Sequence, residues 1–271
     1  MGASSALRAE DWRILIRLVG ECRELGDEPH TWRAHFARQV GRRIGGDLCY
    51  FGELAGCDIQ KPKDLGVTEW GWDAGFDRAS WLAMLRDLHD KASVPITVLT
   101  YLEKLREENG VCLARSDVLT EREWARSDDA RISEAIGTDH AVFCFRSIPG
   151  VAGVHSALQF HREANRRDFS RRDAAFVRES HAALIALVGG PLARFNEPSS
   201  RDLPVRVRRV LACLLEGDGD KQIAVRLGLS AHTVNEYTKA IFRHFLVRSR
   251  PELLARWIRR GHALPPAWVE D

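Results

Sequence analysis

The chain has 271 residues, of which 45% are hydrophobic and 29% are charged. This composition excludes a disordered, collagen-like or repeat-solenoid protein and allows one large domain or two modest ones. The formal net charge is only +2, but it is distributed unevenly. Residues 201–271 carry 13 basic and 8 acidic side chains, which leaves 27 basic and 30 acidic ones for residues 1–200. A mildly acidic body therefore precedes a compact basic tail.

The sequence points to a cytoplasmic protein. No apolar run approaches the ~18 residues of a membrane span, and residues 1–10 lack the apolar core of a signal peptide. The cysteines are scattered without any CxxC pair, so we expect reduced, mostly buried thiols and no structural zinc site. They are Cys22, Cys49, Cys57, Cys112, Cys144 and Cys213. We expect no metal, no cofactor and no membrane partner.

The first 190 residues mix helices and strands. Apolar residues at helical spacing predict helices over residues 10–25, 31–44, 78–91 and 96–108. The inner face of the first is expected to contain Trp12, Leu15, Ile16, Val19 and Cys22. Alternating patterns predict strands over residues 47–54, 69–72, 141–145 and 154–161, the last two forming a hairpin.

Two capping boxes mark further helix starts. Thr120 with Glu123 begins a short helix, and Ser170 with Asp173 begins a long one that ends near residue 189. Helices combined with an antiparallel sheet indicate an α+β sandwich. The hairpin, the polar loop and the Phe-Ser-x-x-Asp helix start resemble the end of GAF-type sensory domains, of which the PAS fold is a relative. The resemblance covers residues 20–190 and implies a sensory or dimerisation domain over residues 1–195.

The tail has a different pattern. Residues 196–202 form a short linker, and apolar stripes separated by Gly and Ser predict an all-α domain over residues 203–271. Its four helices are expected over residues 205–216, 221–227, 230–245 and 249–261. A short helix, a Gly-Leu-Ser turn and a longer helix make a helix-turn-helix, whose second helix reads the major groove of DNA.

The tail closely resembles the DNA-binding domain of LuxR-type regulators. The matching residues are Leu203, Arg206, Leu211, Gly217, Lys221, Ile223, Ala224, Leu227, Leu229, Ser230, Thr233, Val234, Ile241, Val247, Ser249, Arg250, Glu252, Leu253, Arg259, Arg260 and Gly261. The resemblance implies that double-stranded DNA is the partner and that Asn235, Glu236 and Lys239 read bases. Asn suits adenine, Glu accepts from cytosine, and Lys donates to guanine or phosphate.

Other residues near turns and helix ends are expected to contact phosphates rather than bases. They are Lys221, Arg226, Thr233, Arg248 and Arg250. The family's last helix contacts a second copy, which implies a homodimer through Leu254, Trp257 and Ile258, although Trp257 equally suits the core of the domain.

The chain departs from the family pattern at several positions. Val207, Asn235, Tyr237 and Leu246 stand where the family usually has Glu, Lys, His and Gly. The missing basic residue at Asn235, beside Glu236, predicts lowered DNA affinity. A glycine at position 246 would supply a positive φ, which costs leucine on the order of 1 kcal/mol. Either the turn differs, or Leu246 packs.

The signal received by the first domain is less defined. Its aromatic residues line either a small-molecule pocket or an ordinary core; they are Tyr50, Trp70, Trp72, Trp81, Phe143 and Phe160. An acyl-homoserine-lactone pocket is not expected, since neither Trp70 nor Trp72 is followed four residues later by Tyr and no Asp-Pro occurs. His155 and His161 are expected on a polar face rather than at a metal.

The sequence thus predicts a dimeric transcription regulator modulated by a signal, and two alternatives stay open. One is a protein-interaction module whose helix-turn-helix no longer binds DNA. The other is an enzyme fused to a regulatory tail, which the absence of hydrolase, metalloprotease, phosphate-loop and dinucleotide motifs argues against. A phosphoacceptor receiver is excluded because no alternating βα pattern with a strand-terminal Asp is present.

Overall fold

The computed structural model describes residues 6–56, 63–83, 100, 103–104 and 107–259. Its internal contacts divide the chain into two compact units, one of residues 1–25 and 29–188 and one of residues 26–28 and 189–271. Most of the two helices predicted over residues 78–91 and 96–108 lies outside the described residues. Within the described part, residues 78–83, 100, 103–104 and 107 are helical.

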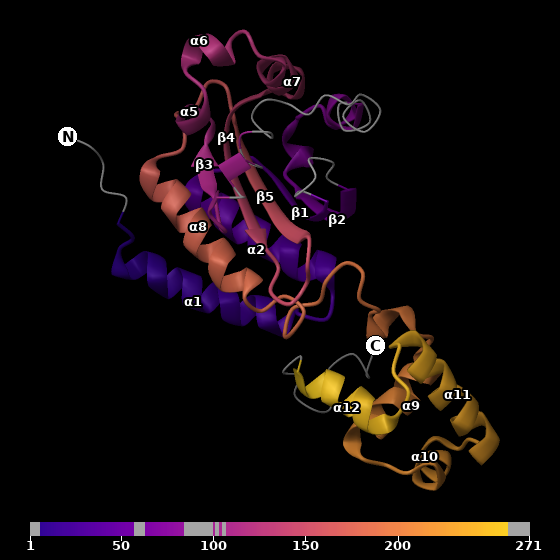
Figure 1. Cartoon of the computed structure of the whole chain (residues 1–271). Coiled ribbons are helices and arrows are strands. Elements are labelled where there is room, and N and C mark those ends of the chain that lie inside the picture. The colour runs from indigo at the N-terminus through magenta and orange to yellow at the C-terminus, as the bar shows by residue number, and fades with distance from the viewer. Residues whose placement is uncertain (1–5, 57–62, 84–99, 101–102, 105–106, 260–271) are drawn as a thin grey trace. The chain divides into compact units, whose positions relative to one another are not determined.

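The first unit is built on a five-stranded sheet (Figure 1). The strands are β1 (Leu48–Ala55), β2 (Lys63–Trp70), β3 (Cys112–Ala114), β4 (Thr138–Ser147) and β5 (Val154–Glu163). Their order is β2-β1-β5-β4-β3 and the neighbouring pairs are antiparallel. The predicted α+β class and the β4–β5 hairpin are confirmed.

Three helices cover one face of this sheet. They are α1 (Ala9–Glu24), α2 (Pro29–Ile44) and α8 (Arg171–Ile185). Helices α2 and α8 lie against the strands, and α1 packs on both of them (Figure 1). Phe51 is at the centre of this layer, with its ring 5.5 Å from Trp32 and 5.3 Å from Phe36.

Charged groups are buried within the same layer. Arg33 and Glu53 form an ion pair whose side chains have no exposed surface, and the Arg33 guanidinium lies 3.9 Å from the Trp32 ring centroid. Asp11 of α1 is also fully buried and binds Arg43 of α2 and Arg172 of α8. These contacts tie the three helices together.

Short elements connect the strands, and Trp72, Val118 and Ile136 from three of them pack on the other face of the sheet. The elements are η2 (Trp72–Ala74), α5 (Arg115–Val118), α6 (Glu121–Trp124) and α7 (Asp128–Ile136). The predicted cap of α6 is confirmed, because the Glu123 amide donates to Thr120 Oγ1 and the Thr120 amide to the Glu123 carboxylate. Helix α7 was not predicted.

The second unit is helical, as predicted. It contains η3 (Ser200–Asp202), α9 (Val205–Glu216), α10 (Asp220–Leu227), α11 (Ala231–His244) and α12 (Arg250–Arg259). Val210, Leu211, Ile223, Val234 and Ile241 are fully buried at the centre of its core. The α9 and α10 bounds agree with the predicted ones to within one residue.

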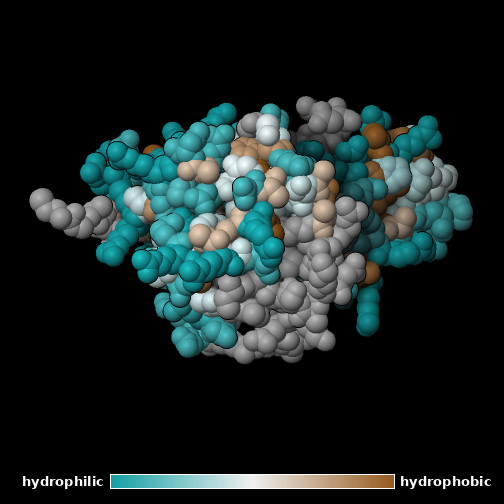
Figure 2. Space-filling view, turned by 90° about the horizontal axis from the view of Figure 1, so that it is seen from above, coloured by the Kyte–Doolittle hydropathy of each residue, from teal (hydrophilic) through white to brown (hydrophobic). Residues whose placement is uncertain are grey.

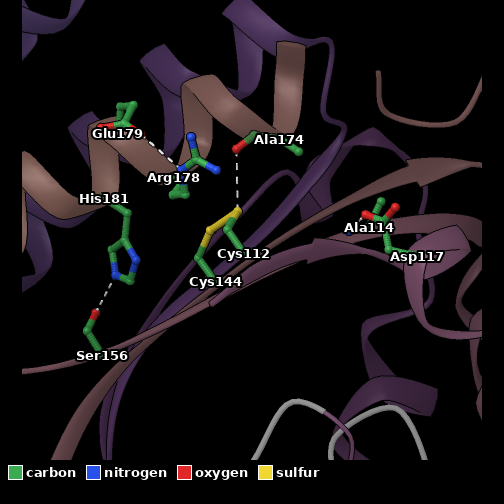
Figure 3. The surroundings of a disulfide bond; sticks show 9 residues. All are labelled: Cys112, Ala114, Asp117, Cys144, Ser156, Ala174, Arg178, Glu179 and His181. Carbon is green, nitrogen blue, oxygen red and sulfur yellow. Dashed lines mark hydrogen bonds and ion pairs between the residues drawn. A yellow bond between two sulfur atoms is a disulfide. The ribbon is translucent and has the colours of Figure 1, made fainter. Parts of the chain in front are cut away.

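One expectation about the cysteines is wrong. Cys112 of β3 and Cys144 of β4 form a disulfide (Figure 3). The sequence could not show this because the two residues are 32 positions apart and meet only through the register of the sheet. Cys22, Cys49 and Cys213 are free and buried, as expected.

The described residues on the face shown in Figure 2 are mostly hydrophilic, and their apolar side chains form small separate groups. No helix among the described residues is long and apolar enough to span a bilayer. The same residues contain no cluster of His, Cys, Asp and Glu that could hold a metal ion.

Candidate nucleic-acid interface and effector cavity

A tight turn joins α10 to α11. Gly228 has φ 63°, in the left-handed region that favours glycine, and the Leu229 amide donates to the Ala224 carbonyl. Ser230 then caps α11 by accepting from the Thr233 amide at 3.0 Å. This geometry, which the Gly-Leu-Ser motif predicted, fixes the start of the second helix.

Helix α11 separates a packing face from an outer face. Val234 and Ile241 are fully buried against α9 and α10. Asn235, Glu236 and Lys239, the predicted base readers, are all exposed. The structure therefore presents these three side chains together on one surface of the helix, as a groove-reading helix requires.

Two of these residues bind each other. Lys239 Nζ donates to Glu236 Oε1 at 2.9 Å, and both side chains are more than half exposed. The hydrogen bond from Lys239 lowers the pKa of Glu236 below its ordinary value, so this carboxylate is ionised at neutral pH. The outer face of α11 therefore carries an anion directly beside its cation.

The predicted phosphate contacts differ in availability. Lys221 and Arg248 are exposed, whereas Arg226 donates to the carboxylates of Glu216 and Asp218, which raise its pKa. Thr233 has its hydroxyl within 2.8 Å of the hydroxyl of the Ser230 cap, and the fifth residue, Arg250, is partly buried.

Arg250 has a structural role that the sequence did not reveal. Its guanidinium donates to the carbonyls of Asp218 at 2.7 Å and Leu214 at 2.6 Å. These carbonyls lie at or just beyond the C-terminal end of α9, where backbone acceptors have no intrahelical partner. Arg250 therefore joins the start of α12 to the end of α9.

Leu246 follows the end of α11 in a left-handed conformation. Its φ is 55°, and it is the single described non-glycine residue with a positive φ. Its side chain is 83% exposed. Both alternatives for Leu246 are therefore wrong, because the turn keeps the geometry that suits glycine and the side chain does not pack.

The three predicted dimer-contact residues of α12 lie in different environments. Trp257 is 3% exposed and packs edge-on against Phe245, with ring centroids 5.9 Å apart. This corrects its placement at a dimer contact, because the side chain fills the core. Leu254 is half-buried, and Ile258 is 75% exposed.

The predicted aromatic pocket is split by the sheet. Tyr50, Trp72 and Trp81 line a cavity of about 10 Å³ together with Leu48, Cys49, Ile136 and His161. The volume is that of about one water molecule. Phe143 adjoins this cluster, with its ring 6.0 Å from His161.

Trp70 and Phe160 lie on the opposite face, which corrects the predicted set. Trp70 packs over Gly41 of α2 so closely that a Cβ on Gly41 would lie 2.4 Å from the indole ring, and Phe160 packs near Gly46. Both residues pair with Cys49 across β1, so their side chains project to the same side of the sheet.

Three of the residues that line the cavity carry buried polar atoms without formal charge. The indole nitrogens of Trp72 and Trp81 and Nδ1 of His161 are buried and have no hydrogen-bond partner among the described residues. Burial lowers the pKa of His161 to about 4, so the ring is neutral near pH 7. The expectation that His161 lies on a polar face is wrong, since its ring packs between Trp81 and Phe143.

Comparisons with known proteins identify a family for part of the second unit. Residues 202–256 match the family described as bacterial regulatory proteins, luxR family. No curated protein matches the chain.

Several solved structures are similar over most of their length. SdiA in complex with octanoyl-rac-glycerol is 16% identical with a TM-score of 0.41, covering 93% of this chain and 94% of that one. Another structure of SdiA, from Escherichia coli, is 16% identical with a TM-score of 0.38 and covers 86% and 92%. CepR2 from Burkholderia cenocepacia, an N-acylhomoserine lactone dependent LuxR family transcription factor, is 12% identical with a TM-score of 0.44 and covers 65% and 91%.

Proposed function

We propose that this chain, whose residues 202–256 form a helix-turn-helix domain of the luxR family, is a dimeric, sequence-specific DNA-binding transcription regulator whose first unit receives a signal. The observation that carries the proposal is the outer face of α11. Its three predicted base readers are all exposed, on a helix that begins at the Ser230 cap directly after the turn at Gly228. No catalytic role is proposed, and the site of action is the DNA inside the cell.

The chemistry of the outer face suggests how it reads bases. Asn235 can make a paired hydrogen bond with adenine, Glu236 can accept from the amino group of cytosine, and Lys239 can donate to guanine. Each correct contact is worth about 1–3 kcal/mol of discrimination. Lys221 and Arg248 would position the helix by binding phosphates.

The acidic partners of two cations make a second copy important. Glu236 offsets Lys239, and Glu216 and Asp218 offset Arg226, so these two cations are less available to phosphate. A dimer doubles these contacts and reads two half-sites related by symmetry. Ile258, exposed on α12, is the predicted dimer residue that remains available.

Selection of bound sites from random duplex tests the proposal. The full chain should enrich a motif with two-fold symmetry, and Lys239→Ala should weaken binding to that motif by about 1–3 kcal/mol while changing binding to random DNA little. Equal losses on both DNAs would make Lys239 a phosphate contact. No enrichment of any motif would overturn sequence-specific binding.

One observation favours a second candidate function. The carboxylates beside Lys239 and Arg226 could equally belong to a protein-interaction module whose helix-turn-helix has lost its affinity for DNA. Such a module would enrich no motif and would show no salt-dependent binding to duplex DNA, so the two candidates make opposite predictions.

The aromatic cluster around the cavity beside the sheet is the proposed effector site. The cavity of about 10 Å³ holds about one water molecule, so a ligand must displace the surrounding side chains to bind there. Its two indole N–H groups and the neutral His161 ring favour an uncharged ligand that carries hydrogen-bond acceptors, because buried donors without partners are costly. Uncharged compounds that raise the melting temperature should lose this effect in Trp81→Phe, which keeps an aromatic ring but removes the N–H. They should keep it in the matched control Trp70→Phe, on the opposite face. If the rise in melting temperature were lost in both variants, or in neither, the proposed location of the effector site would be wrong.

A further inference from the structure

Two cysteines meet across the edge of the sheet. Cys112 of β3 lies directly opposite Cys144 of β4 in antiparallel register. The neighbouring pair is joined by a hydrogen bond from the Phe145 amide to the Val111 carbonyl, so the cysteines occupy the alternate pair, where side chains approach most closely. Their Cα atoms are 4.1 Å apart and their sulfur atoms are bonded (Figure 3).

The pair can be reached from solvent through one of its members. Cys144 is 1% exposed, but Cys112 is half-buried on a three-residue edge strand that pairs with β4. The described free cysteines contrast with it, because burial raises the pKa of the Cys22 thiol to about 12 and also raises those of Cys49 and Cys213. Burial therefore disfavours reaction at these three thiols, whereas the access to Cys112 favours reaction there.

The structure also offers a partner for the reduced form. Cys112 Sγ lies 3.4 Å from the carbonyl oxygen of Ala174 in α8 (Figure 3). A Cys112 thiol could donate a hydrogen bond to this oxygen, whereas a disulfide sulfur has no proton to donate. Oxidation therefore exchanges a β3–α8 hydrogen bond for a β3–β4 covalent bond.

We propose that Cys112 and Cys144 form a redox modification site that cycles between a dithiol and a disulfide in response to peroxides. This inference rests on the proposed function in one respect: a regulator that binds DNA works in a reducing compartment, where disulfides are usually transient and catalytic or redox-sensing rather than structural. Cys112 is the attacking residue and Cys144 the resolving residue.

The chemistry balances with hydrogen peroxide as the oxidant. The Cys112 thiolate attacks one peroxide oxygen; an S–O bond forms, the O–O bond breaks, and the leaving hydroxide takes a proton to become water. Cys144 then attacks Cys112 Sγ; the S–S bond forms, the S–O bond breaks, and a second hydroxide leaves as water. The two thiols are oxidised by two electrons, and two equivalents of a small thiol reverse the reaction.

Differential alkylation of the folded full-length chain tests the site without DNA. After reduction with dithiothreitol, brief treatment with hydrogen peroxide should remove two alkylatable thiols. Mass spectrometry should then find the peptide that contains Cys112 linked to the peptide that contains Cys144. Fresh dithiothreitol should restore both thiols without denaturant. Cys22→Ser, which changes a buried cysteine, should behave like the wild type.

Melting temperatures of the oxidised and reduced proteins distinguish loss of the disulfide from misfolding of a variant. The disulfide should raise the melting temperature by about 5–10 °C because it closes a long loop in the unfolded chain, and Cys112→Ser should melt like the reduced wild type under both conditions. The proposal is overturned if peroxide leaves both thiols free, or if dithiothreitol cannot reduce the bond in the folded protein. Failure to bind DNA would leave these results unchanged and would count against the proposed function alone.

Discussion

Leu246 holds a backbone conformation that ordinarily needs glycine, and its side chain gains no stabilising contacts from burial. A leucine at φ 55° with 83% of its side chain exposed bears a local cost that the domain does not offset through contacts. We expect Leu246→Gly to stabilise the second unit by about 1 kcal/mol, because glycine adopts this φ without strain.

Val225 provides the matched control for that substitution. It is also apolar and highly exposed, at 85%, but it lies within α10. Val225→Gly should therefore destabilise by about 0.5–1 kcal/mol, since glycine is unfavourable inside a helix. Urea unfolding of the two full-length variants measures both changes in the free energy of unfolding. A loss of stability in Leu246→Gly would contradict the claim that Leu246 is strained.

Residue-level prediction succeeded where a local rule decides the conformation. The caps at Thr120, Ser170 and Ser230 follow from hydrogen bonds within three residues, and all are confirmed. The Cys112–Cys144 pair and the burial of Trp257 depend on which distant elements meet, and no local pattern carries that information.

Asp11 shows what the packing of helices does to a single carboxylate. Its burial would raise the pKa, but the hydrogen bond from the Arg8 amide and those from Arg172 and Arg43 outweigh this and lower the pKa to about 2. A folded pKa below the unfolded value of about 3.8 stabilises the protein above pH 4. This contribution, about 2 kcal/mol, is lost as the pH falls from about 4 to 2.

Acid unfolding of a variant checks this contribution. Asp11→Asn should lower the free energy of unfolding at pH 7 by at least this amount and should flatten the dependence of stability on pH between about 4 and 2. Glu24→Gln, an exposed carboxylate on the same helix, should leave the curve as in the wild type. If the dependence of stability on pH stayed unchanged in Asp11→Asn, Arg43 and Arg172 would not stabilise the charged Asp11 carboxylate in solution.

Helix α11 yields a second prediction at the scale of an element. Glu236→Gln removes the anion that binds Lys239, so affinity for random duplex should rise several-fold near about 100 mM salt and the salt slope should steepen by about one phosphate contact. Glu24→Gln makes the same change in net charge outside the helix-turn-helix and should leave both quantities unaltered. Equal effects of the two variants would mean that net charge alone controls binding.

The elements themselves were predicted well where the apolar spacing was regular. The helices of the tail and the β4–β5 hairpin match to within a few residues. The predicted inner face of α1 was partly wrong, since Trp12 and Ile16 are exposed while Leu15 and Cys22 are buried. Buried Asp11 shifts the packed face, and a hydrophobic pattern cannot anticipate a buried carboxylate.

The predicted pocket failed for a related reason at the scale of the sheet. Its six aromatics were grouped by chemistry, whereas the alternation of side chains along each strand sends Trp70 and Phe160 to one face and Tyr50 and Phe143 to the other. The register needed to separate them comes from the assembled sheet.

At the scale of the whole molecule, the net charge of +2 results from an acidic first part and a basic tail. In the second unit, carboxylates bind Arg226 and Lys239. This pattern suits a regulator that relies on base contacts and on a second copy more than on general attraction to DNA. Non-specific affinity should accordingly be modest, with a salt slope set by the number of phosphates bound.

The most direct test of DNA binding is a salt titration of the full-length chain on random duplex DNA, followed by fluorescence anisotropy. We predict measurable binding at about 50 mM salt, with the logarithm of affinity falling linearly with the logarithm of salt concentration. Lys221→Ala and Arg248→Ala should each reduce the slope by about 1. No binding even at about 50 mM salt would contradict the account.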